Sequence, residues 1–447
     1  MKQWTASPEH SRRVGSGPPP PHHPERKRRA ACSRLRRGPW AGGLFGSLLL
    51  FLTLCCIACG TGGDPADATS PSADSDSAGA AQSALDGPEG IRVIGDRVFV
   101  TSTAAALDDA TGTMTYGQGY VSALDRDSLD ELGRVDTPWL NPQTLVVTGE
   151  GPDVTEDSGA SDEGADIRAA SAPDGSGTAA GAMLAVVCSG RLEADDSGRM
   201  LAATPGGVLL VDPQTLEILG QVEVPAGTPG LLGGFPGSAV FDSSADILFA
   251  GSGIGPYVYR VDLDSLAVES VFTVHPESET NDLVVPALAG GILYVSSQRT
   301  GMLYRLDPAT GASTGEPIDI TKTDAYEGPI DIAVTGSTLY VLSTISSRVA
   351  AVDLGSGEVT YPFAAGAAPN RLLFHEGTLY VVNSLDNNLT RFDPVTGKAV
   401  APFAPLPVGT NPWEMAAQGA TGYITGYLDD TVYAVSLEDG SILATSR

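Results

Sequence analysis

Short apolar strands alternate with small polar loops through the C-terminal half of the chain. Four copies of this pattern are clear, over Ile292–Gly311, Thr338–Gly357, Thr378–Gly397 and Thr421–Gly440. Each copy holds an apolar strand, a polar loop, a second strand and a turn that begins with Asp or Ser. The residues that begin these turns recur with a period of roughly 40–46 residues, which predicts a stacked or circular array of small sheets. They are Asp262, Asp307, Asp353, Asp393 and Ser436.

Dividing the chain before each predicted inner strand gives seven units that begin near Glu89, Asn141, Pro236, Asn281, Pro329, Asn370 and Asn411. Each unit fits a four-stranded blade, so the sequence predicts an all-β, seven-bladed β-propeller over residues 88–447. The second unit holds an acidic stretch at about 151–181 without apolar periodicity, which we predict to be a disordered insert. Either Met183–Ser189 or Arg199–Thr204 fits the second strand of that unit. Six and eight blades therefore stay open.

The N-terminus has the pattern of an export leader over residues 1–58. A basic segment precedes the uncharged apolar stretch Ala41–Ala58, and Cys59-Gly60 follows it. The segment Cys56–Gly60 resembles a bacterial lipobox, in which Cys59 would be lipidated, and residues 59–87 then form a flexible Gly/Ser/Ala/Asp tether. The alternative is a transmembrane anchor, because the apolar stretch is just long enough to span a bilayer. The tether favours the lipoprotein, and Gly60 resembles outer-membrane sorting.

The chain is strongly acidic, with a formal net charge of −28, and the leader holds many of the basic residues. Such a surface repels nucleic acid, so we expect no nucleic-acid partner. Salt adaptation and a GC-rich genome explain the scarcity of Lys equally well. Of the five cysteines, only Cys188 lies beyond residue 59, so the propeller has no disulfide to form. Its apolar strand makes it a buried structural thiol rather than a nucleophile.

The stretch Leu379–Gly397 followed by Val408–Pro412 resembles the YVTN-type β-propeller family of surface and exported proteins. In that family a Val-Gly-x-x-Pro segment opens each inner strand and Asp-x-x-Thr-Gly turns the outer hairpin. The similarity is clearest over Pro236–Arg447. Ser436 departs from it, because it replaces the turn Asp of the last unit. The resemblance implies either a non-catalytic binding protein or an enzyme of the lactonase-like or cytochrome-linked sort.

Polar residues before and at the start of the presumptive inner strands are the candidate ligand site, because propeller ligands bind where these segments meet at one end of the central channel. The candidates are Asn141, Asp282, Asp331, Asn370, Arg371, Asn411 and Glu414. Neighbouring loops add Tyr116, Arg299, Asn383, Asp386, Asn387, Asp429 and Asp430. The sequence predicts a polar, mostly acidic channel mouth for a small cationic or sugar-like ligand. The alternative for each single residue is a turn cap.

We expect four of these residues to occupy equivalent positions of successive inner strands, namely Asp282, Asp331, Asn370 and Asn411. Oxygen ligands that converge from several blades suit a hard cation, so Asp282 and Asp331 are candidate ligands for Ca²⁺, the one candidate cofactor. No catalytic residue is assigned. His275 and His375 are the only histidines after the leader, and neither has an evident orienting partner in the sequence.

These patterns predict an exported lipoprotein of a bacterial cell envelope, anchored in the outer membrane and facing the periplasm or the surface. Its propeller is expected to be a monomeric, non-catalytic binding or scaffold module for a protein or small-molecule ligand at the channel mouth. The alternative is a lactonase-like hydrolase at the same place, with a divalent cation.

Overall fold

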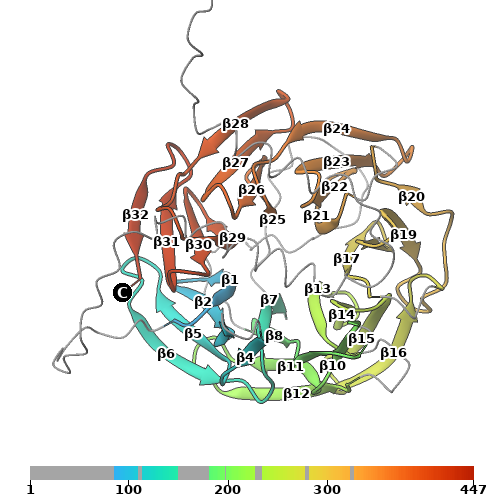
Figure 1. The fold of residues 1–447 in the computed structure, drawn as a ribbon, viewed down its shortest axis with the longest axis horizontal. Helices are drawn as coiled ribbons and strands as arrows, with labels where there is room; N and C mark the ends of the chain where they lie inside the picture. Colours follow the sequence, from blue (N-terminus) through green and yellow to red (C-terminus); the bar gives the residue numbers. More distant parts are fainter. Residues whose placement is uncertain are drawn as a thin grey trace, which may run out of the picture. The chain divides into compact units, whose positions relative to one another are not determined.

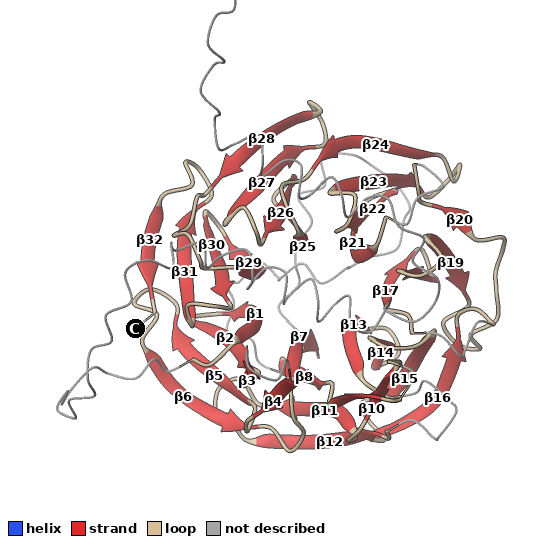
Figure 2. Cartoon of the chain, viewed as in Figure 1, coloured by secondary structure: helices blue, strands red, loops and turns tan. Residues whose placement is uncertain are grey.

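The computed structural model describes residues 85–108, 113–148, 181–196, 198–226, 234–276, 281–322 and 327–446. These form seven four-stranded antiparallel sheets arranged in a ring (Figure 1). Their regular secondary structure is all strand (Figure 2). The all-β, seven-bladed propeller is thereby confirmed.

The predicted leader, the acidic insert up to residue 180 and the tether up to residue 84 lie outside the described residues. Across the described ranges, no helix is long and apolar enough to span a membrane. The apolar stretch Ala41–Ala58 falls outside those ranges, so the lipoprotein prediction and its transmembrane alternative both stay predictions.

Each blade is built from four strands that follow one another along the chain. The innermost strands, which surround the centre of the ring in Figure 1, are β1 (Pro88–Ile94), β7 (Pro142–Thr148), β13 (Pro236–Asp242), β17 (Val284–Ala289), β21 (Pro329–Thr335), β25 (Pro369–His375) and β29 (Pro412–Gln418). The second strands are β2 (Arg97–Ser102), β8 (Met183–Cys188), β14 (Ile247–Ser252), β18 (Ile292–Ser297), β22 (Thr338–Ser343), β26 (Thr378–Asn383) and β30 (Thr421–Gly426).

The outer half of each blade is again a pair of antiparallel strands. The third strands are β5 (Tyr120–Asp125), β11 (Gly206–Val211), β15 (Tyr257–Asp262), β19 (Met302–Leu306), β23 (Arg348–Asp353), β27 (Asn388–Asp393) and β31 (Thr431–Ser436). The outermost strands are β6 (Glu131–Asp136), β12 (Ile218–Val224), β16 (Ala267–Thr273), β20 (Ile318–Asp319), β24 (Val359–Ala364), β28 (Lys398–Phe403) and β32 (Ile442–Thr445).

Two additional hairpins extend the second-to-third strand connections of blades 1 and 2. They are β3 (Ala105–Asp108) with β4 (Thr113–Tyr116), and β9 (Leu192–Ala194) with β10 (Met200–Ala202). The second hairpin settles the strand assignment that the sequence left open, because Met183–Cys188 is the second strand of blade 2 and Met200–Ala202 belongs to the hairpin. That hairpin reaches blade 4, where the Asn281 side chain accepts from Met200 N and donates to Met200 O.

The core is divided into layers between neighbouring blades. Seven clusters of buried apolar side chains fill the seven blade–blade interfaces, and each takes its members from two adjacent blades. The second and third strands are apolar on both faces because each face packs against a neighbouring blade. This explains the continuous apolar runs of the repeat. Cys188 is fully buried in the layer between blades 1 and 2, where burial raises the pKa of its thiol to about 12.

The repeated Asp of the sequence pattern holds the turn between the third and outermost strands. In blade 6, Asp393 Oδ1 accepts hydrogen bonds from Val395 N at 2.9 Å and Thr396 N at 3.1 Å. The hydrogen bond from the Thr396 hydroxyl, together with these backbone bonds, favours the ionised carboxylate and lowers the pKa of Asp393. In blade 7, Ser436 Oγ accepts from Asp439 N at 3.3 Å instead. The prediction of turn residues at these places is confirmed.

Six of the seven inner strands begin with proline, at residues 88, 142, 236, 329, 369 and 412. The residue before each of these prolines has a positive φ, namely Gly87, Asn141, Phe235, Gly328, Ala368 and Asn411. This left-handed residue turns the chain from the preceding blade into the new inner strand. Gly and Asn adopt that conformation most readily, which accounts for the Asn-Pro and Gly-Pro pairs of the repeat.

Blade 1 closes the ring against blade 7 without sharing a strand with it. An apolar layer from both blades fills this seam. Polar contacts also cross it: Gly87 N donates to Asp430 Oδ1 at 2.9 Å, and the Thr425 hydroxyl donates to Glu89 O at 2.9 Å. In addition, Arg92 Nη1 pairs with Glu414 Oε1 at 2.5 Å, and each of these two side chains is only 8% exposed.

Candidate functional site

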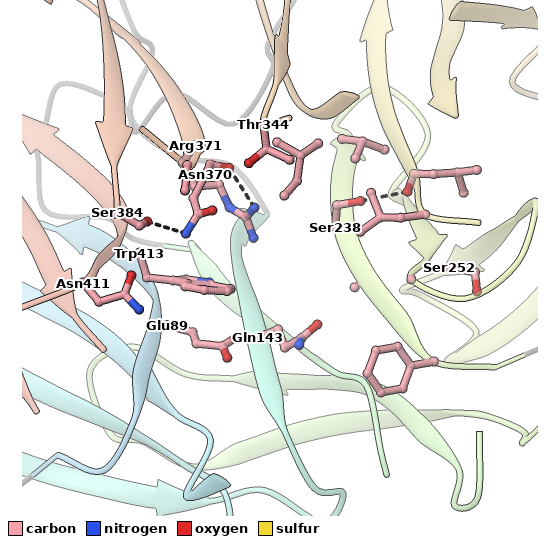
Figure 3. A pocket seen from close by; sticks show the side chains of 18 residues that line it. Glu89, Gln143, Ser238, Ser252, Thr344, Asn370, Arg371, Ser384, Asn411 and Trp413 are labelled. Carbon is pink, nitrogen blue, oxygen red and sulfur yellow. Dashed lines mark hydrogen bonds between the residues drawn. The ribbon is translucent and has the colours of Figure 1, made fainter. Parts of the chain in front are cut away.

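A pocket lies at one end of the central channel, at the start of the inner strands. It contains about 800 Å³ of empty space, part of it open to solvent, and every one of the seven inner strands contributes to its wall. Figure 3 shows the side chains that line it. We call it the mouth pocket. A second pocket lies further along the inner strands in the central channel and shares Ser238, Val285 and Arg371 with the first.

The residue after each strand-opening position forms a ring in the wall of the mouth pocket. In order from blade 1 to blade 7 this ring is Glu89, Gln143, Gly237, Val285, Ile330, Asn370 and Trp413. In this ring, blades 6, 7, 1 and 2 therefore present hydrogen-bonding side chains, whereas blades 4 and 5 present apolar ones and blade 3 presents a glycine. Outside the ring, Ser238, Ser252 and Thr344 add hydroxyl groups to the wall of blades 3 and 5. Leu283 and Phe235 extend the apolar side. We call the side formed by blades 6, 7, 1 and 2 the polar half of the pocket and the opposite side, where most of the contact area is apolar, the apolar half.

The Asn411 side chain is the most unusual group of the polar half. It is 4% exposed, and neither its oxygen nor its nitrogen has a hydrogen-bond partner. A buried polar atom without a partner costs about 1–3 kcal/mol. The indole nitrogen of neighbouring Trp413 is buried without a partner as well. In Figure 3 both side chains lie on the same side of the pocket.

Glu89 is a buried acid in the polar half. It is 6% exposed, and burial raises the pKa of its carboxyl to about 8, opposed by the nearby Arg371 guanidinium and reinforced by the negative charge of Glu414. At neutral pH this carboxyl is therefore mostly protonated and can donate a hydrogen bond. The hydroxyls of Tyr116 and Tyr427 also lie near it, and burial raises the pKa of each.

Arg371 reaches from blade 6 into both pockets. Its Nη1 donates to the carbonyl of Asn370 at 3.2 Å, and this is its one hydrogen bond to the described residues. It forms no ion pair with them, although its charge acts on Glu89 and Asp331. Most of the donors of this guanidinium are therefore unused by the described chain.

Deeper in the channel, Asp331 accepts a hydrogen bond from Leu372 N at 2.7 Å. Burial inside the channel raises the pKa of Asp331 to about 6, which the Arg371 charge and this hydrogen bond oppose. Glu414 uses one oxygen in its ion pair with Arg92, and its other oxygen is buried without a partner. The channel thus contains two arginines among three carboxyl groups, one of them mostly neutral at pH 7.

Some of the predicted site residues line the mouth pocket, some line the deeper pocket and others line neither. Asn370, Arg371 and Asn411 line the mouth pocket, and Asp331, Arg371 and Glu414 line the deeper one. Asn141 is buried before β7 and lines neither pocket. Among the loop candidates, Asn387 and Asp430 accept backbone hydrogen bonds from the next blade, at Asn411 N and Gly87 N.

The other loop candidates also contact the chain itself. Asp386 accepts from Ala367 N, Asn383 donates to Asn388 and Thr390, and Asp429 accepts from Thr410 and Tyr433.

Asp282 does not face the channel. Its carboxylate accepts from the Ser297 hydroxyl at 2.6 Å and Arg299 N at 2.9 Å, and it contacts His275 Nε2 at 2.7 Å. The expectation that His275 lacks an orienting partner is therefore wrong. The serine and the histidine both contact the same buried carboxylate, and all three groups are buried, so they join blades 3 and 4 rather than expose a nucleophile. His375 Nε2 donates a hydrogen bond to Gly419 O at 2.8 Å.

The expectation that Asp282, Asp331, Asn370 and Asn411 occupy equivalent positions is also wrong. Relative to the strand-opening position, Asn411 lies one residue before, Asn370 one after and Asp331 two after, while Asp282 lies two before Val284. Within the described residues, no group of three or more His, Cys, Asp or Glu side chains is placed to hold a metal ion. The predicted Ca²⁺ site thus gains no support from a convergent ligand set.

Sequence reasoning missed Glu89, Arg92, Gln143 and Trp413 as channel residues. The strand-opening proline would have found three of them, because the residue that follows it enters the ring of the mouth pocket. Glu89, Gln143 and Trp413 each follow such a proline. Arg92 lies deeper on β1, and no signal in the repeat pattern marks it.

No protein-family model and no curated protein matches the chain. Membership of the YVTN-type family therefore stays a prediction. Solved structures with a similar fold include the computationally designed Ika8 protein, with a TM-score of 0.49 and 10% identity over 81% of this chain and 88% of that one. Virginiamycin B lyase from Staphylococcus aureus has a TM-score of 0.46 and 14% identity, over 77% of this chain and 92% of that one.

Hydrazine synthase from Kuenenia stuttgartiensis has a TM-score of 0.49 and 14% identity, over 79% of this chain and 97% of that one. With identities of 10–14% and TM-scores of 0.46–0.49, these similarities carry no argument about the function of this chain.

Proposed function

We propose that this chain is an exported lipoprotein whose propeller is a non-catalytic binding module for a small molecule at the mouth pocket. The apolar stretch, the lipobox-like segment and the tether support the lipoprotein part of the proposal. The proposed location is a bacterial outer membrane, with Cys59 as the lipidated residue. The acidic surface supports the absence of a nucleic-acid partner.

One observation carries the binding part of the proposal. The Asn411 amide is buried in the wall of the mouth pocket with both polar atoms unpartnered. Burying such a group without a partner does not stabilise the fold, whereas a ligand that bonds to the Asn411 nitrogen would recover part of the loss. The adjoining apolar half supplies contact area for the body of that ligand, as in other small-molecule sites.

The test uses the full chain labelled with 5-fluorotryptophan and a library of small polar and amphipathic fragments. Binding at the mouth should shift the ¹⁹F resonance of Trp413 and leave that of Trp139, which packs between blades 1 and 2, unchanged. Substituting Asn411→Gly should weaken binding, and the matched Asn141→Gly should not. A library that shifts neither resonance, or both alike, contradicts the proposal.

A second candidate is a lactonase-like hydrolase, which the two acids of the channel favour. Glu89, with a pKa of about 8, and Asp331, with a pKa of about 6, lie in one channel with different protonation preferences, as an acid and base pair requires. Hydrolysis of a sugar lactone that is abolished by both Glu89→Gln and Asp331→Asn, but not by His275→Asn, would establish it. Activity that survives both substitutions would reject it.

A further inference from the structure

The polar half of the mouth pocket is richer in unused donors than in acceptors. Arg371 contributes most of its guanidinium N–H groups. Asn411 and Trp413 contribute nitrogens without partners. Glu89 adds an O–H when it is protonated. A ligand group that faces this wall must therefore be rich in acceptors.

We infer that the mouth pocket takes a small carboxylic acid with an apolar body, its carboxylate bound by the Arg371 guanidinium. This inference rests on the proposed binding function and names the class of its ligand. A carboxylate offers about four lone-pair sites and no donor, which matches the unused donors. A planar guanidinium binds it in a bidentate manner. The apolar body would lie against Val285, Ile330 and Phe235 on the opposite half.

The charges around Arg371 decide whether an anion can be held there. Asp331 and Glu414 lie deeper in the channel, and Arg92 already pairs with Glu414. Glu89 lies in the mouth itself and is the group that would repel a bound carboxylate if it were ionised. Burial holds it in the protonated form at neutral pH. The mouth pocket thus keeps the positive charge of Arg371 available to a ligand, although the chain as a whole is acidic.

The experiment compares matched pairs of probes that differ only in the head group: 3-phenylpropanoate with 3-phenylpropanamide, and hexanoate with hexanamide. Affinities for the full chain are measured at moderate salt, which screens the distant acidic surface. We expect each carboxylate to bind at least about tenfold more tightly than its amide. Arg371→Gln should remove that preference, whereas Arg305→Gln, on the outer part of blade 4, should leave it unchanged.

The pH dependence gives an independent readout. As pH rises through about 8, Glu89 loses its proton beside the bound carboxylate, so the affinity of wild type for 3-phenylpropanoate should fall by up to about tenfold per pH unit. Between pH 7 and 9.5, Asp331 is ionised throughout, and the tyrosines Tyr116 and Tyr427, with raised pKa values, keep their protons. Glu89→Gln keeps a donor at every pH and should bind with a flat profile.

These experiments distinguish a failure of the carboxylate inference from a failure of the proposed binding function. Equal affinity for the carboxylate and its amide, or a preference that survives Arg371→Gln, overturns the carboxylate inference and leaves the binding function standing. If neither member of either pair binds while other fragments shift the Trp413 resonance, the inference also falls and the function stands. If no fragment shifts that resonance, both are wrong.

Discussion

Replacing Asn411 with glycine tests whether the Asn411 side chain serves to bind a ligand or to stabilise the fold. Asn411 has a φ of 48°, in the left-handed region that glycine adopts without strain. Asn411→Gly therefore keeps the backbone conformation and removes only the buried amide. Asn141 is the matched control, because it also precedes a strand-opening proline, with a φ of 59°. Its side chain leaves no buried polar atom without a partner.

The expected difference in the free energy of unfolding follows from comparing the two substitutions. In both, relief of left-handed strain by about 1–2 kcal/mol at most opposes the extra chain entropy of glycine, about 0.5–1 kcal/mol. Only Asn411→Gly also removes an unpartnered buried amide, which costs about 1–3 kcal/mol. The free energy of unfolding of Asn411→Gly should therefore exceed that of Asn141→Gly by about 1–3 kcal/mol. For a propeller of this size, that is a difference in Tm of about 1–4 °C.

Urea denaturation of both full-length variants and wild type, followed by far-ultraviolet circular dichroism, measures the difference. Calorimetry checks the Tm. If Asn411→Gly is less stable than Asn141→Gly, the Asn411 amide contributes to the fold through hydrogen bonds made in solution. The reasoning that reserves it for a ligand would then be refuted. A stable Asn411→Gly that binds fragments as wild type does would equally separate the amide from function.

Three further predictions concern the seam, the buried acid and the anchor. Arg92→Met should lower the free energy of unfolding by about 3–5 kcal/mol, because it leaves the buried Glu414 carboxylate unpaired. In a double-mutant cycle, adding Glu414→Leu should recover much of this loss. Losses that simply add would refute the coupling. Because the pKa of Glu89 is raised from 4.5 to about 8, its contribution to stability is fully present below pH 4.5 and is lost as pH rises towards 8. The free energy of unfolding of Glu89→Gln should therefore change less with pH in that window than that of wild type. Identical pH profiles would show that the pKa of Glu89 is ordinary in the folded chain. Cys59→Ala should release the protein from the membrane fraction, and a variant that stays firmly bound would favour a membrane-spanning leader.

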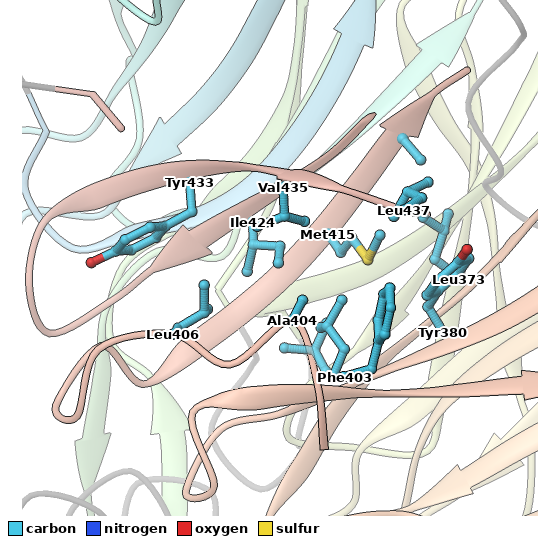
Figure 4. Packing of buried hydrophobic residues seen from close by; sticks show 13 residues of the cluster. Leu373, Tyr380, Phe403, Ala404, Leu406, Met415, Ile424, Tyr433, Val435 and Leu437 are labelled. Atoms are coloured by element: carbon cyan, nitrogen blue, oxygen red, sulfur yellow. The ribbon is translucent and has the colours of Figure 1, made fainter. Parts of the chain in front are cut away.

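The fold was predictable because its repeat consists of apolar strands and Asp-capped turns, which depend on interactions between residues close in sequence. The apolar layer between blades 6 and 7 (Figure 4) contains Tyr380 and Val382 from one second strand and Ile424 from the next, all inside the apolar runs that defined the repeat. Asp393 marked its turn because an Asp side chain caps the backbone two and three residues later. Both signals act within a few residues, so a single sequence is enough to read them.

The site was predicted only in part, because it depends on register at one-residue precision. Asn370 and Arg371 were found, whereas Asp282 was wrongly placed in the channel ring although it lies before its strand and contacts His275 instead. A shift of one residue turns a strand side chain to the other face. Which residue reaches the channel is therefore set by the strand-opening position. Apolar residues such as Ile330 gave no functional signal, although they form half of the pocket wall.

The non-covalent seam between β1 and β29 implies that the chain tolerates circular permutation. Every blade is complete within one stretch of chain, and Gly87 and Asp430, which hydrogen-bond across the seam, are 343 residues apart in sequence. Neighbouring blades elsewhere meet through the same kinds of layer, with a covalent connection added. A circular permutant that joins β32 to β1 by a short linker and opens the chain between β20 and β21 would keep every four-stranded sheet intact. The seam would then lie between blades 4 and 5, and the mouth pocket would keep all seven of its walls.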